Sequence, residues 1–97
     1  MGPDFVSGLI LSVTEIVGDY SAKKGHRLLT FLGYTVLAAE MLYFLYDGGQ
    51  SLTLVNGNWD AISNVLTFLL GFYMGERFTS VQYLGLAMIS VGLFLIQ

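Results

Sequence analysis

The chain alternates four long apolar stretches with three short polar breaks. The stretches are Phe5–Ala22, Leu28–Tyr46, Leu52–Met74 and Val81–Ile96. A helix that crosses the hydrocarbon layer needs about 20 residues, so all four have suitable lengths, the first and last being short. Runs such as LTFLLGFYM lack the alternating polarity of a membrane strand. The pattern predicts an all-α membrane protein, with residues 1–97 forming one bundle of four transmembrane helices.

The breaks carry the residues that end and begin helices. Gly25 is expected to stop the first helix, Ser51 to cap the third, and Thr79 or Ser80 to cap the fourth. Breaks this short force consecutive helices to run antiparallel, which places both termini on one side of the bundle.

The composition agrees with lipid as the solvent. Hydrophobic residues make up 55% of the chain and charged residues 11%, whereas a soluble domain carries roughly a quarter charged residues. Four Lys and Arg residues provide no basic stripe for a nucleic acid. With no cysteine, no nucleotide-binding motif and no catalytic constellation, we expect no cofactor, no metal site and no enzymatic activity.

The basic residues predict an orientation. Lys23, Lys24, Arg27 and Arg77 all lie in the first and third breaks, which share one side of the membrane. Positively charged residues stay cytoplasmic. We therefore expect residues 23–27 and 75–80 in the cytoplasm and both termini outside.

Three acidic residues, Glu15, Glu40 and Asp60, fall well inside predicted spans, and Asp19 lies nearer a helix end. Acids inside a membrane are costly and usually face a bundle interior with a function. None of the basic residues is embedded beside them, so the acids are candidates for binding protons or a cation.

Helical spacing groups these acids with other residues. Glu15 shares a face of the first helix with Gly8, Ser12 and Asp19, and these small neighbours are expected to leave room beside it. In the third helix a polar stripe borders Trp59, a residue that can hold an organic cation through its ring. The stripe consists of Asn56, Asp60, Ser63, Asn64 and Thr67.

A second interpretation treats some acids as hydrogen-bonding glue between helices. We favour glue for Glu40, regard both interpretations as open for Asp60, and favour function for Glu15. Asp19 either pairs with Lys23, four residues further along the helix, or takes part in binding.

The last helix has a small-residue face. Gly85 and Gly92 are seven residues apart with Ile89 between them, and small residues let helices approach closely. We expect this face to form a dimer contact.

The sequence resembles the small multidrug resistance family, the four-helix branch of the drug/metabolite transporters. The stretch TEIVGDYSAKKG is similar to the region around the family's membrane-embedded glutamate, here Glu15, with Gly18 and Lys23 at matching spacings. Trp59 resembles the family tryptophan of the third helix. The turn Gly75-Glu76-Arg77 and the glycine spacing of the last helix also match.

The resemblance implies a dimer in which two glutamates line one pocket and exchange protons for small organic cations. The chain departs from the family at a tyrosine, replaced by Asn56, and at a glycine pair, replaced by Ala61 and Ser63. Asp19, Glu40 and Asp60 are additional acids. The alternative function is a non-transporting membrane protein that assembles with or modulates another membrane complex.

Family homodimers are antiparallel, which requires chains that insert in both directions, whereas this chain has a complete charge bias. We predict a single orientation, and hence a parallel homodimer or an antiparallel dimer with an oppositely biased partner. Single cysteines at positions 2 and 49 should both be labelled from outside by an impermeant reagent. Equal labelling of position 2 from both sides would contradict this prediction.

Overall fold

The computed structural model describes residues 2–97, and this part of the chain is helical with no strands. The predicted four-helix organisation is confirmed, and each helix ends within one or two residues of its expected position. The helices are α1 (Pro3–Lys23), α2 (Arg27–Met41) with its π-helical continuation η1 (Leu42–Asp47), α3 (Leu52–Tyr73) and α4 (Ser80–Leu95).

The helix ends form as the sequence predicts. Gly25 follows α1 with a φ of +79°, a backbone conformation that side chains with a Cβ rarely adopt. The Ser51 side chain accepts a hydrogen bond from the Leu54 N–H at the start of α3. Thr79 and Gln82 form a reciprocal capping box at the start of α4. These local interactions set the three turns that reverse the chain.

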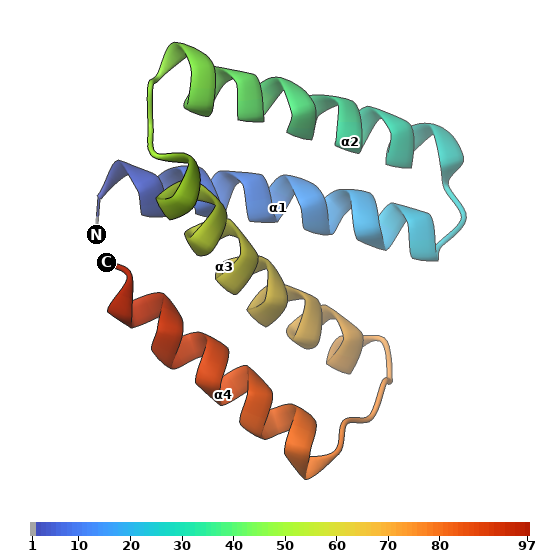
Figure 1. The fold of residues 1–97 in the computed structure, drawn as a ribbon. Helices are drawn as coiled ribbons and strands as arrows, with labels where there is room; N and C mark the ends of the chain where they lie inside the picture. The colour runs from blue at the N-terminus through green and yellow to red at the C-terminus, as the bar shows by residue number, and fades with distance from the viewer. Residues whose placement is uncertain (1) are drawn as a thin grey trace.

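The helices form a broad, flattened arrangement with extents of 40 × 37 × 15 Å. Helix α1 packs against both α2 and α3, and α4 packs against α3. Figure 1 shows α2 and α4 at opposite edges, with both termini at the same end. The four helices therefore form an open arrangement rather than a closed bundle, because the two edge helices, α2 and α4, do not pack against each other.

Glycines allow the closest helix contacts. A Cβ at Gly8 would lie 2.7 Å from the Asn58 Cβ and 2.8 Å from the Trp59 backbone nitrogen, so α1 rests directly on the α3 backbone. On the other side of α1, a Cβ at Gly33 would lie 3.3 Å from the Gly18 Cα. The position of α1 between its two neighbours thus depends on residues without side chains.

The core is small and lies where α1, the end of α2 and the start of α3 meet. Its buried side chains are Leu11, Leu37 and Val55. The partly buried residues Met41, Phe44, Leu45 and Trp59 pack around them.

Most large apolar side chains lie outside this core. Phe31 is 74% exposed, Tyr46 is 82% exposed, and α4 contributes no buried residue. Helix α1 and the continuous helix Arg27–Asp47 are each long and apolar enough to cross a membrane. Helix α4 is apolar but shorter, at 16 residues, and α3 is long but interrupted by polar residues.

Replacing Gly8 with alanine should lower the free energy of unfolding by about 1–3 kcal/mol, because the added methyl group meets backbone atoms of α3 that cannot move aside. The measurement is a denaturant titration in detergent micelles followed by circular dichroism.

Gly57→Ala is the matched control. A Cβ there would meet only the terminal methyl group of Ile96, at 3.2 Å. This methyl group can rotate away, and alanine favours the helix by up to about 1 kcal/mol. Equal destabilisation by both variants would contradict the close α1–α3 contact.

Candidate functional site

Glu15 lies half-buried where α1 faces α3, and its Oε1 accepts a hydrogen bond from the Ser63 hydroxyl. Ser63 belongs to the polar stripe predicted on α3. The fold therefore brings together a carboxyl group and a neutral hydroxyl from residues 48 positions apart in sequence. This pair is the candidate site.

Ser12, one turn before Glu15, is fully buried between the same helices. Its hydroxyl lies 2.7 Å from the Gly8 carbonyl oxygen and 3.1 Å from the Trp59 carbonyl oxygen, to which it donates. The expectation that small residues leave room beside Glu15 fails on this side, because Asn58 and Trp59 of α3 fill the space over Gly8. Ser12 thus holds the two helices together, and its predicted role in binding stays a prediction.

The indole ring of Trp59 packs against the core cluster. Its Nε1–H is buried and has no hydrogen-bond partner within residues 2–97. A buried donor without an acceptor is unfavourable, so the packing of this ring against the core leaves one polar group unsatisfied.

Asp60, Asn64 and Thr67 are exposed on α3 and Asn56 is partly exposed. Asn56 donates to the Leu52 carbonyl oxygen at 2.9 Å, and Asn64 to the Asp60 carbonyl oxygen at 2.7 Å. Asn56 and Asn64 therefore bond to their own helix, and Ser63 is the member of the polar stripe that bonds to another one. In this single chain the Asp60 carboxyl group faces outward.

The remaining two acids bond across to neighbouring helices. The Glu40 carboxylate accepts from the Thr14 hydroxyl, with distances of 2.5 and 3.0 Å to its two oxygens. The Tyr34 hydroxyl donates to Asp19 Oδ1. Both pairs join α1 to α2, an arrangement that fits the glue interpretation for Glu40 and gives Asp19 a partner other than Lys23.

Two further long-range hydrogen bonds involve residues that the sequence did not single out, and each joins a helix to a residue outside the helices. The Ser7 hydroxyl donates to Gln50 Oε1 at 2.7 Å. Gln97 Nε2 donates to Oδ1 of Asn58, which is 1% exposed, at 2.6 Å. Asn58 lies two residues after Asn56, hence about 200° around the helix from it, and this offset was the available signal that it faces the core.

The predicted dimer face of α4 is open. A Cβ at Gly85 or Gly92 would have no atom within 4 Å in the described part of the chain, and Ile89 is half-buried. A hollow of about 440 Å³ runs along this helix. Its lining residues are Leu84, Ala87, Met88, Val91, Gly92 and Leu95.

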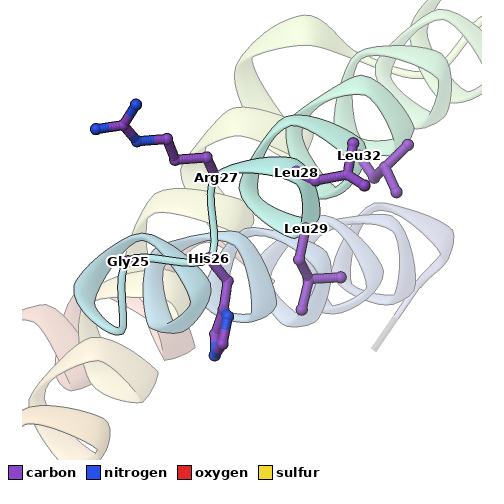
Figure 2. Close-up of a pocket in the computed structure, with 6 residues that line it drawn as sticks. All are labelled: Gly25, His26, Arg27, Leu28, Leu29 and Leu32. Carbon is purple, nitrogen blue, oxygen red and sulfur yellow. The ribbon is translucent and has the colours of Figure 1, made fainter.

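A hollow of about 510 Å³ lies away from Glu15, at the α1–α2 turn (Figure 2). Within residues 2–97, no group of three His, Asp or Glu side chains is placed to hold a metal ion.

Comparison with known proteins gives no assignment: the chain matches no family model, no curated protein and no solved structure.

Thr14 and Glu40 should be energetically coupled. In a double-mutant cycle with Thr14→Val and Glu40→Leu, the hydrogen bond should appear as a coupling of about 1 kcal/mol in the free energy of unfolding. The measurement is a denaturant titration of the four proteins in micelles.

The control cycle combines Thr14→Val with Asp60→Leu, since the Asp60 side chain is exposed on α3. Its effects should add. A Thr14–Glu40 coupling no larger than that of the control would remove the assignment of Glu40 as interhelical glue.

Proposed function

We propose that this chain is a membrane-embedded carrier that exchanges protons for small organic cations, with Glu15 as the shared binding group. The observation that carries the proposal is the setting of Glu15, a half-buried carboxyl group between two helices whose hydrogen-bond partner is a neutral hydroxyl. All four Lys and Arg residues belong to the breaks at 23–27 and 75–80. The charge of Glu15 is thus left to be balanced by a proton or a cation.

Competition at one carboxyl group is sufficient to couple two transported species. A carboxylate that holds a proton cannot at the same time balance a cationic substrate. If the site opens alternately to the two sides of the membrane, loading by one species requires release of the other, and the two move in opposite directions.

The hydrogen bond from Ser63 is compatible with this role. It engages Oε1 of Glu15, and a hydrogen bond to a charged group contributes only about 1.5–3 kcal/mol. A cation that approaches the carboxylate can compensate for such a bond. In this role Ser63 positions the Glu15 side chain while no substrate is bound.

The surface supports a membrane location. Large apolar side chains are exposed along α1, α2 and α4, and the exposed apolar area of a soluble monomer is normally broken into small patches. Two of the helices have the length and apolarity of membrane spans. In the proposal α3 and α4 also cross the bilayer, with α3 shielded by partners on its polar side.

A dimer is part of the proposal. In lipid the exposed polar stripe of α3 needs a cover, because unsatisfied polar groups are costly there. The open face around Gly85 and Gly92 offers a surface where a second helix can approach closely. The sequence resemblance to small multidrug resistance proteins supports the same assembly, with Trp59, Asp60 and Asn56 near the bound cation.

The alternative is a non-transporting membrane protein that assembles with another membrane complex. The interhelical bonds of Glu40 with Thr14 and of Asp19 with Tyr34 favour it, because they show acids serving as links between helices. Glu15 separates the two functions, since only transport requires its proton to be exchangeable.

Glu15→Gln should abolish the proton release that accompanies addition of a substrate cation to the purified protein, because a glutamine amide has no titratable proton to give up. The measurement is the pH change of a weakly buffered detergent solution during titration with guanidinium, quaternary ammonium and polyamine compounds.

Glu40→Gln is the matched control, since its carboxyl group already bonds to Thr14, and it should keep the proton release of the parent protein. Size-exclusion chromatography checks that both variants remain assembled. If the parent protein releases no protons with any compound of the panel, the non-transporting alternative is favoured.

A further inference from the structure

The turn between α1 and α2 combines an apolar groove with most of the chain's positive charge. The groove begins in the hollow of about 510 Å³ shown in Figure 2. A second hollow, of about 300 Å³, lies beside it, and both are lined by Gly25 and Arg27. Leu28, Leu29 and Leu32 line the first hollow, and Ala22 and Phe31 line the second. Arg27 thus stands between two apolar depressions.

The first hollow continues along the molecule. A third depression of about 300 Å³ shares Leu29 and Leu32 with it and extends between α1 and α2 as far as Val36. Val36 lies seven positions after Leu29, which corresponds to about 10 Å along a helix. The α1–α2 seam therefore offers an apolar track that starts at a charged turn and runs along the helices.

The charge at the head of the track is concentrated. Lys23, Lys24, His26 and Arg27 occupy four of five consecutive positions in a chain whose net charge is −3. The Lys24 ammonium group lies 5.8 Å from the centre of the Tyr20 ring. Figure 2 shows the Arg27 guanidinium group directed away from the leucine side chains into open space. The cationic groups are accessible beside the apolar entrance.

We propose that this seam binds an anionic phospholipid, with its phosphate at Arg27 and its acyl chains in the apolar depressions. A free phosphate would use the charge but not the track, whereas a zwitterionic lipid would use the track but gain less from the charge. The two features together select an amphiphile with an anionic head.

The track and the proposed transport site lie on opposite sides of α1. Val13 and Val17, which line the track, are each two residues from Glu15 and hence about 200° around the helix from it. A bound lipid leaves Glu15 accessible. The inference rests on the proposed membrane location, not on transport.

The test uses tryptophan fluorescence in the full chain reconstituted in mixed bilayers. In a Trp59→Phe background, Phe31→Trp places a reporter beside the second hollow. Quenching by a brominated phosphatidylglycerol should exceed quenching by the matched brominated phosphatidylcholine. The binding constant of the anionic lipid should be about fivefold that of the zwitterionic lipid, which is the effect of one basic side chain near the surface.

Two matched controls define the site. Tyr46→Trp reports on the opposite end of the same helix, which has no basic residue near it in the sequence. The native tyrosine is 82% exposed compared with 74% for Phe31, and the ratio of the two binding constants there should be near one. Arg27→Gln should remove the preference at position 31, whereas Arg77→Gln, with the same loss of charge, should leave it unchanged.

Three results would overturn the proposal: no preference at position 31, equal preference at positions 31 and 46, or loss of the preference in inorganic phosphate but not in sodium chloride of the same ionic strength. Flotation of the chain with vesicles measures the membrane location separately. A chain that floats and shows no lipid preference contradicts only the lipid site, whereas a chain that does not float contradicts the location on which both proposals rest.

Discussion

The direct contact of α1 with the backbone of α3 is the constraint on which the rest of the structure depends. Gly8 has no side chain to hold the helices apart, and Ser12 ties them through its bond to the Trp59 carbonyl oxygen. Only at this separation does Glu15, further along α1, lie within hydrogen-bonding reach of Ser63. A wider spacing would leave the carboxyl group without its partner.

The polar residues of α3 divide the helix between two tasks. Asn58, on the core side, is buried and accepts from Gln97, so it connects the start of α3 with the end of α4. Asp60, Asn64 and Thr67 lie on an exposed side of the helix. One helix therefore stabilises the fold through its buried side and carries exposed polar groups on its other side.

The helices and their ends could be predicted from the sequence because they depend on local information. The length of each apolar stretch sets the length of its helix, and Gly25, Ser51 and Thr79 set the turns through their own backbone and side-chain preferences. The face of the first helix that contains Glu15 could also be predicted, because helical spacing fixes which residues share a side.

The partners across helices could not be predicted in the same way. The periodicity of a helix indicates which of its faces is polar. It does not indicate which residue of another helix lies opposite, or how far the two helices are shifted along their axes. The bonds of Thr14 with Glu40 and of Tyr34 with Asp19 depend on the relative translation of α1 and α2. That translation follows from the close approach of Gly18 and Gly33, whose packing the spacing of polar residues does not encode.

The π-helical segment η1 changes the direction in which the last side chains of the second helix point. A π-turn holds one more residue than an α-turn, so the side chains within Leu42–Asp47 are shifted in angle relative to a regular continuation of α2. The helix ends with this segment, since Gly48 is its C-cap. Which of these last side chains meet the core, as Phe44 and Leu45 do, therefore does not follow from the 3.6-residue period that places the residues of α2.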